Sequence, residues 1–132
     1  MNRHTTDRCA AEAEPTHNQL IGSRGEAIAR EHLERRGCTI LASNWRTRAG
    51  ELDLVIRDGE TIVAVEVKTR TGLGYGHPLE AITARKAHRL RRLLGDWART
   101  HAARGARLRV DAIGIVLRDG ERPRLDHLQG IA

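Results

Sequence analysis

Aromatic residues are nearly absent from this sequence. Its 132 residues include no Phe, and the aromatic side chains are limited to Trp45, Tyr75 and Trp97. Proteins that bind single-stranded nucleic acid without sequence preference commonly stack the bases on aromatic rings. The shortage of rings argues against that class of protein, and it leaves the phosphate backbone as the part of a nucleic acid that the chain would contact.

Cysteines and long apolar runs are also scarce. The two cysteines, Cys9 and Cys38, are too far apart in the sequence to suggest a zinc site or a disulfide framework. No apolar run is long enough to span a bilayer, and the first residues lack the apolar core of a secretory signal. These absences predict a cytoplasmic protein that does not associate with a membrane.

Charged residues are plentiful and basic residues predominate. The chain has 23 Lys and Arg residues against 17 Asp and Glu residues, which gives a net charge of +6. A small basic domain is a candidate for binding a polyanion, and nucleic acid is the commonest one. The length suits one domain, so we expect a flexible tail over residues 1–17 and a single domain over residues 18–132.

The pattern of apolar residues predicts an α/β fold. Helical spacing and strand-like alternation follow one another along the chain, and the turn sequence Asp-Gly-Glu at 58–60 is typical of a hairpin. The expected elements are a helix at about residues 18–36, strands at 38–45, 51–57 and 61–70, a helix at about 83–101 and a strand at 108–117, and residues 124–128 are a candidate for a short fifth strand. This order, α-β-β-β-α-β, predicts a small mixed sheet flanked by helices.

A glycine-rich segment, TGLGYGHP, occupies residues 71–78 after the third strand. Its Gly-x-Gly-x-Gly spacing is compatible with phosphate binding, but the rest of a P-loop or dinucleotide-binding motif is missing. We therefore interpret the segment as a mobile loop. His77 could reach a substrate from this loop, although a plain surface position is the simpler interpretation.

Charged residues interrupt two of the expected strands. Residues i and i+2 of a strand share a face, so Glu51 and Asp53 should lie on one face, with the leucines of that strand on the other. Glu66 and Lys68 share a face of the next strand for the same reason. If the two strands pair as a hairpin, one patch of the sheet carries all four charged side chains.

Such a patch is costly to bury unless something compensates its charge. Carboxylates lose hydration and repel each other when they are brought together. Lys68 can neutralise one of them, whereas a divalent cation would neutralise two and would use their oxygens as ligands. Oxygen ligands favour a hard ion, so Mg²⁺ or Mn²⁺ is expected. The alternative is an edge strand whose solvated face carries the same residues as ordinary surface charges.

The arrangement of Asp53, twelve intervening residues and Glu66-Val67-Lys68 is similar to the D…ExK signature of the restriction-endonuclease-like nuclease superfamily. Together with GELDLV, VEVKTR and a first helix that bears a glutamate, the region from Gly22 to Leu128 resembles the YraN-like family within that superfamily. It is also similar to archaeal Holliday-junction resolvases. The resemblance implies a restriction-endonuclease-like fold and a metal-dependent endonuclease that hydrolyses DNA, including branched or junction DNA, and that acts as a homodimer.

The resemblance also implies roles for individual residues. Asp53 and Glu66 would be metal ligands, and Lys68 would position or activate the attacking water. Glu26, on the first helix, would complete the metal environment. The sequence departs from many members of the superfamily just before the aspartate, where Leu52 replaces a proline.

Glu26 also has a structural interpretation. The sequence Ser-Arg-Gly-Glu at 23–26 fits a capping box, and Glu26 and Arg30 have the spacing of an ion pair within a helix. Against the capping box, helical periodicity begins near Leu20, which would place Ser23 inside the helix.

Basic residues crowd the start of the second helix. Arg85, Lys86 and Arg89 are candidates for phosphate contacts that give affinity without sequence readout, and Lys86 and Arg85 are the foremost of them. The same cluster is also typical of a solvated helix face.

Three further residues belong to the YraN-like pattern. Arg70 is a candidate nucleic-acid contact, whereas Glu51 and Asp111 are candidates for support of the site or of the sheet. The alternative function for the chain is a non-catalytic nucleic-acid-binding module, or a scaffold in DNA processing, that keeps the nuclease fold.

Overall fold

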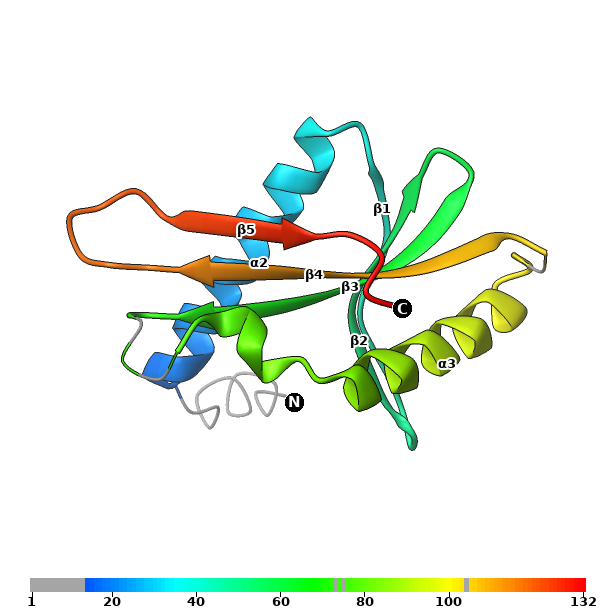
Figure 1. Ribbon diagram of the computed structural model, residues 1–132, viewed down its shortest axis with the longest axis horizontal. Helices are drawn as coiled ribbons and strands as arrows, with labels where there is room; N and C mark the ends of the chain where they lie inside the picture. The colour runs from blue at the N-terminus through cyan, green and yellow to red at the C-terminus, as the bar shows by residue number, and fades with distance from the viewer. Residues whose placement is uncertain (1–13, 73, 75, 104) are drawn as a thin grey trace, which may run out of the picture.

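The fold was analysed in a computed structural model that describes residues 14–132 except residues 73, 75 and 104. The elements are α2 (His17–Arg35), β1 (Thr39–Thr47), β2 (Gly50–Asp58), β3 (Thr61–Arg70), the 3-10 helix η1 (Pro78–Ala81), α3 (Ala84–Thr100), β4 (Arg107–Val116) and β5 (Arg124–Leu128) (Figure 1). The predicted α-β-β-β-α-β order is confirmed. The expected glycine-rich loop falls partly outside the described residues, and so does most of the expected tail.

The five strands form one mixed sheet in the order β1-β2-β3-β4-β5. β1, β2 and β3 pair antiparallel through short connections, and so do β4 and β5. β3 and β4 are parallel, because η1 and α3 carry the chain back to the end at which β3 began. The predicted hairpin of β2 and β3 and the predicted mixed sheet are therefore confirmed.

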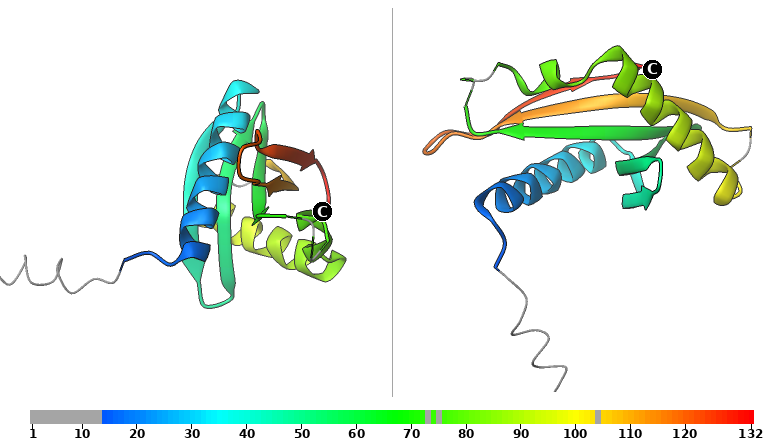
Figure 2. Two further views of the ribbon diagram at one scale, coloured as in Figure 1. Left: turned by 90° about the vertical axis from the view of Figure 1, so that its left-hand side faces the viewer. Right: turned by 90° about the horizontal axis from the view of Figure 1, so that it is seen from below.

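α2 and α3 cover opposite faces of this sheet (Figure 2). α2 packs on one face through Ala29 and Leu33, and α3 packs on the other through Leu90, Leu94 and Trp97. Both apolar stripes lie where helical spacing predicts them. Burial of these side chains is the main source of stability, and it fixes each helix relative to β2 and β3. Among the described residues, no helix is long and apolar enough to cross a membrane.

The N-terminus of α2 is fixed by a capping box. The Thr16 hydroxyl accepts a hydrogen bond from the Gln19 backbone N–H at 3.1 Å, and the Gln19 side chain accepts one from the Thr16 N–H at 2.8 Å. Since the helix begins at His17, Ser23 lies inside it. The capping-box interpretation of Glu26 is therefore wrong.

Gly25 allows α2 to lie close against β3. A Cβ atom at this position would be 1.8 Å from the Thr69 hydroxyl oxygen, a separation that no side chain can tolerate. The absence of a side chain at Gly25 therefore sets the distance between helix and strand, immediately before Glu26.

β2 separates from β3 partway along its length. Their pairing runs only from Asp58↔Thr61 to Leu54↔Val65, whereas β2 stays paired with β1 as far as Gly50. Strict alternation predicts that Leu52 and Leu54 share a face, and that prediction is wrong: Leu52 packs on the α3 side and Leu54 on the α2 side. The strand is irregular around Asp53, and a residue of the opposing β1 segment, Asn44, has a φ of 52°. A fork between β2 and β3 results, with Asp53 at its base.

Candidate functional site

Asp53 lies where β2 leaves β3. Its carboxylate Oδ2 accepts a hydrogen bond from the Val67 backbone N–H at 2.9 Å. Val67 lies beyond the last residue pair of β2 and β3, so its N–H has no backbone acceptor on β2. The Asp53 side chain supplies the acceptor instead. Asp53 is therefore held against β3, next to Glu66.

Glu66 is almost buried, with 7% of its surface exposed. Its carboxylate Oε2 is 2.7 Å from the Nζ of Lys86. Lys86 lies in the first turn of α3, where its backbone N–H donates to the hydroxyl of the N-cap Thr83 at 3.1 Å. The helix start thus presents a cation to a carboxylate of the sheet.

Asp53 and Glu66 together are called the acidic pair below. Burial raises the pKa of Asp53, and the neighbouring Glu66 carboxylate raises it further, to about 7. The hydrogen bond from Val67 opposes this rise without cancelling it. Ionisation of Asp53 beside Glu66 is therefore opposed, first by the loss of hydration and then by the negative charge of Glu66.

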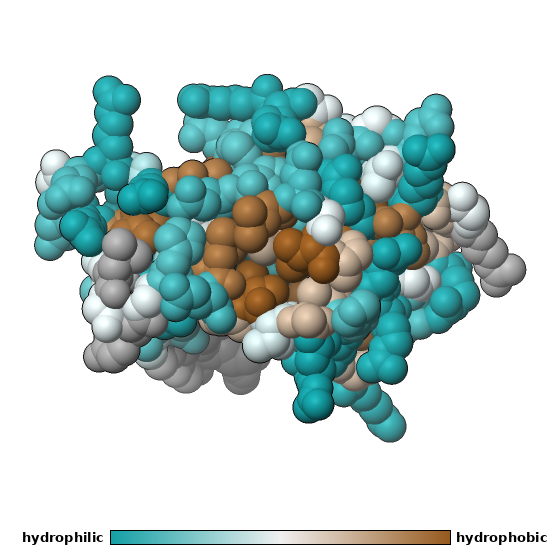
Figure 3. Space-filling model, in the orientation of Figure 1, coloured by the Kyte–Doolittle hydropathy of each residue, from teal (hydrophilic) through white to brown (hydrophobic). Residues whose placement is uncertain are grey.

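A cavity of about 530 Å³ opens beside the acidic pair on the α3 face. The charged side chains that line it come from β2, β3 and α3: Glu51, Asp53, Glu66, Lys68, Lys86 and Arg89. Figure 3 shows hydrophilic side chains gathered over the start of α3, where this helix meets the tip of the β1–β2 hairpin. We call this space the α3-side cavity.

A second cavity, of about 440 Å³, opens on the α2 face of the same fork. Its lining includes Glu26, Asp53, Lys68 and Arg70. Asp53 and Lys68 line both cavities, whereas Glu66 lines only the first and Glu26 only the second. The structure thus brings three of the four predicted catalytic residues around the α3-side cavity, and it places Glu26 in the adjacent α2-side cavity.

Lys68 and Glu26 have few electrostatic partners. Within the described part of the chain, neither side chain forms an ion pair within 4 Å, so the Glu26–Arg30 pair of the structural interpretation is not formed. Lys86, and not Lys68, is the residue that neutralises Glu66.

The acidic pair fits a divalent cation with two protein ligands. Among the described residues, no three His, Cys, Asp or Glu side chains are grouped closely enough to hold a metal ion. Mg²⁺, however, is commonly held by one or two carboxylates, with water and substrate phosphate in its other positions. Burial and then the neighbouring Glu66 carboxylate raise the pKa of Asp53, and a divalent ion between the two carboxylates would offset their repulsion.

Some of the remaining predicted residues line the two cavities, and others do not. Arg89 lines the α3-side cavity, whereas Arg85 is exposed and lines neither cavity. The Nε of Arg70 is buried and has no hydrogen-bond partner in the described part of the protein. Glu51 is half-exposed and lies 3.8 Å from Arg46.

Asp111 lies outside both cavities and is fully buried. Its carboxylate accepts hydrogen bonds from Arg109 at 2.8 and 3.1 Å and from the Gly130 backbone N–H at 3.0 Å, and it lies 2.9 Å from Nε2 of His127. Burial alone would raise the pKa of Asp111, but these hydrogen bonds outweigh it and hold the pKa below its ordinary value. Asp111 ties β4 to β5 and to the C-terminal segment, which is support of the sheet.

Sequence reasoning missed the partners in this network. Arg109 also donates to Asp58 at 2.8 Å, and the ring nitrogens of His127 and His32 lie 3.0 Å apart. The i, i+2 spacing of Arg109 and Asp111 is the one local signal, since it places both side chains on one face of a strand. His77, considered as a substrate contact, lies 2.8 Å from Asp126 and caps η1.

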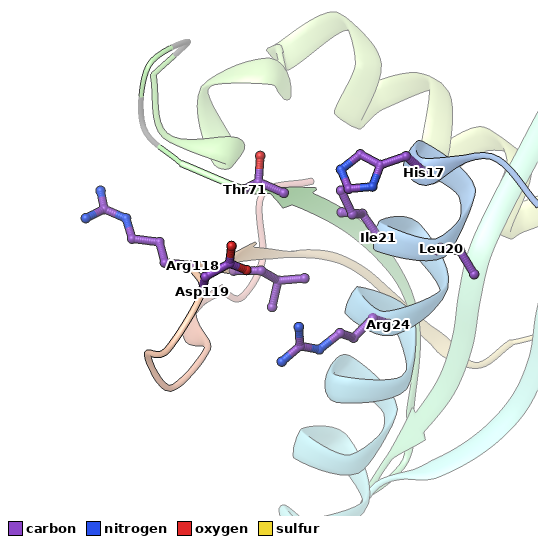
Figure 4. Close-up of a pocket in the computed structure, with 8 residues that line it drawn as sticks. His17, Leu20, Ile21, Arg24, Thr71, Arg118 and Asp119 are labelled. Carbon is purple, nitrogen blue, oxygen red and sulfur yellow. The ribbon is translucent and has the colours of Figure 1, made fainter.

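A third cavity, of about 360 Å³, lies at the N-terminal end of α2 (Figure 4). His17, Ile21 and Arg24 come from α2, and Arg118 and Asp119 follow β4. None of its lining residues lines the α3-side cavity. It contains no predicted catalytic residue, so the acidic pair remains the candidate site.

Comparison with known sequences identifies one family. A sequence model described as "Uncharacterised protein family UPF0102" matches residues 25–115. A UPF0102 protein of Clavibacter michiganensis subsp. michiganensis is 50% identical over 111 residues, which cover 84% of this chain and 94% of that protein. A UPF0102 protein of Paenarthrobacter aurescens is 45% identical over 112 residues, covering 85% of this chain and 93% of that protein. These descriptions name no activity.

Proposed function

The chain belongs to the uncharacterised protein family UPF0102, and on this premise we propose that it is a metal-dependent endonuclease that hydrolyses phosphodiester bonds of DNA. The observation that carries the proposal is the acidic pair, which lines the α3-side cavity together with the cations Lys68, Lys86 and Arg89. The family assignment agrees with the YraN-like resemblance. The wider resemblance to the restriction-endonuclease-like superfamily and to archaeal Holliday-junction resolvases supports the reaction type and suggests branched DNA as a substrate.

The chemistry requires two things that this site can provide. Hydrolysis of a phosphodiester needs an attacking water and relief of negative charge as the bond breaks. A bound Mg²⁺ or Mn²⁺ supplies an acidified water and charge stabilisation. Asp53 and Glu66 would hold the ion through their carboxylate oxygens. Lys68, at the junction of both cavities, would donate to a phosphate oxygen or to the attacking water.

The cations around the site fit a polyanionic substrate. Lys68, Lys86 and Arg89 line the α3-side cavity, and Arg70 lines the cavity on the other face. Such contacts read phosphates and shape rather than base sequence. We propose that the DNA backbone crosses the fork between β2 and β3, with Glu26 approaching the metal environment from α2 and with two copies of the chain acting on the two strands.

A cleavage assay tests this proposal. Labelled duplex, single-stranded and four-way-junction DNA, together with an RNA hairpin, are incubated with the protein in Mg²⁺, Mn²⁺ or EDTA. We expect metal-dependent cleavage that is lost in Asp53→Asn and Lys68→Ala and kept in Asp119→Asn, which removes an exposed carboxylate away from the site. Cleavage that survives both site substitutions would exclude this site as its origin.

The second candidate is a nucleic-acid-binding module without catalysis. The observation in its favour is the ion pair of Lys86 and Glu66, because Glu66 already has a cation without any metal. In that case all variants bind DNA, and no metal produces cleavage on any of the substrates.

A further inference from the structure

Lys86 differs from the other basic residues of α3. Its ammonium contacts the acidic pair at 2.7 Å from Glu66, and its side chain is 26% exposed. Arg85, Arg91 and Arg92 of the same helix are exposed to solvent. The backbone of Lys86 is held by the N-cap of the helix, so this contact is set by the way α3 begins.

One ammonium cannot balance the acidic pair. Lys86 contacts Glu66, and no ion pair within 4 Å reaches Asp53 from any described residue. The two carboxylates therefore share one cation. A divalent ion would supply two charges at once, but it would need the carboxylate that Lys86 contacts.

We propose that Lys86 is a built-in counter-ion of Glu66 that a divalent cation displaces, and that the displaced ammonium then contacts a substrate phosphate in the same cavity. This inference rests on the metal site of the proposed function. The lysine side chain is flexible and compact at its end, so it can change partner by rotation about its own bonds. Lys68 and Arg89 line the cavity it would enter.

This exchange couples metal binding to phosphate binding. When a metal ion binds Glu66, the Lys86 ammonium is released and can bind a phosphate. When a phosphate binds the Lys86 ammonium, the Glu66 carboxylate is released and can bind a metal ion. Coupling between two binding sites is reciprocal, so metal and phosphate each raise the affinity of the protein for the other by the same factor. Lys86 thereby keeps the acidic pair partly neutralised until metal and substrate are present together.

Titration calorimetry with Mn²⁺ alone tests the displacement. Wild type, Lys86→Met and the control Arg92→Met are compared at about pH 8 without DNA. Met keeps a long unbranched side chain with good helix propensity but removes the ammonium that Mn²⁺ would have to displace. We expect Lys86→Met to bind Mn²⁺ about tenfold more tightly than wild type, in line with the loss of one charge-assisted hydrogen bond. Arg92→Met should match wild type.

Binding of a short DNA duplex tests the second half of the proposal. Ca²⁺ replaces Mg²⁺ in this measurement, so that binding is observed without turnover, and affinity is compared with and without the ion. Ca²⁺ should strengthen DNA binding by wild type and by Arg92→Met. The strengthening should be markedly smaller in Lys86→Met, because that variant has no ammonium to release.

The possible outcomes separate this inference from the proposed function. Equal or weaker Mn²⁺ binding by Lys86→Met, with binding lost in Asp53→Asn, would overturn the displacement and leave the metal site intact. No Mn²⁺ binding by wild type or by Lys86→Met would overturn both. Circular dichroism and thermal melting without metal check that each variant is folded, and Lys86→Gln replaces Lys86→Met if the latter is not.

Discussion

Asp53→Asn should make the metal-free protein more stable in alkaline solution. Burial and the Glu66 carboxylate raise the pKa of Asp53 from 3.8 to about 7 in the folded protein. The unfolded chain lacks both effects, so its carboxyl ionises at the ordinary value. Above about pH 7 the folded protein therefore carries an ionised group that its surroundings oppose, and the unfolded chain carries the same group in water.

The size of this effect follows from the shift of the pKa. One unit corresponds to about 1.4 kcal/mol, so a rise of about three units corresponds to about 4 kcal/mol. The raised value makes wild-type stability fall as the pH rises from about 4 to about 7, and the loss is complete above that range. Asn does not ionise, and its oxygen can still accept the Val67 N–H. The stability advantage of Asp53→Asn should be larger at about pH 8.5 than at about pH 4, by about 2–4 kcal/mol.

Urea denaturation followed by tryptophan fluorescence measures this difference. Wild type, Asp53→Asn and the exposed control Asp119→Asn are unfolded in metal-free buffers at about pH 4, 5.5, 7 and 8.5. The advantage of Asp53→Asn should rise across the series, whereas that of the control should stay constant. An advantage that does not change with pH, or a variant less stable than wild type at alkaline pH, would refute the claim that burial and the Glu66 carboxylate oppose ionisation of Asp53 in the folded protein.

Three further predictions concern residues that hold the helices and strands around the site in place, and each is measured by urea denaturation. Gly25→Ala should lower the free energy of unfolding by about 1–3 kcal/mol, because its Cβ would meet a hydroxyl of β3; Gly22→Ala, whose Cβ has nothing within 4 Å, should be neutral or stabilising. Thr16→Ala should lower it by about 1 kcal/mol through loss of the α2 cap, whereas Ser23→Ala should change it little. Asp111→Asn should lower it by about 3–5 kcal/mol at neutral pH; because the pKa of Asp111 is lowered, its contribution is present above about pH 4 and lost as the pH falls further, so the variant and wild type should converge in acid.

Regular elements are predictable from this sequence because their periodicity is strong. The strand expected at 61–70 is β3, Thr61–Arg70, and the helix expected at about 83–101 is α3, Ala84–Thr100. The irregularity of β2 is not predictable in this way. Alternation assumes a regular strand, and the opposite packing of Leu52 and Leu54 depends on how β1 and β2 leave the rest of the sheet.

The same distinction applies to the candidate site. The neighbourhood of Asp53 and Glu66 follows from the hairpin turn that joins their two strands, and this signal is local. The ion pair of Lys86 with Glu66 has no local signal, because it depends on where α3 begins over the sheet. For the same reason the contact of His127 with Asp111 could not be inferred before β4 and β5 were placed side by side.

The most direct test of the central claim is the single-turnover rate of DNA cleavage by wild type and Asp53→Asn in Mg²⁺, with EDTA as the metal-free reference. Wild type should cut at least one of the DNA forms, EDTA should abolish the reaction, and Asp53→Asn should lower the rate by about a hundredfold or more. Equal rates for the two proteins, or no cleavage by wild type with either Mg²⁺ or Mn²⁺, would contradict the claim.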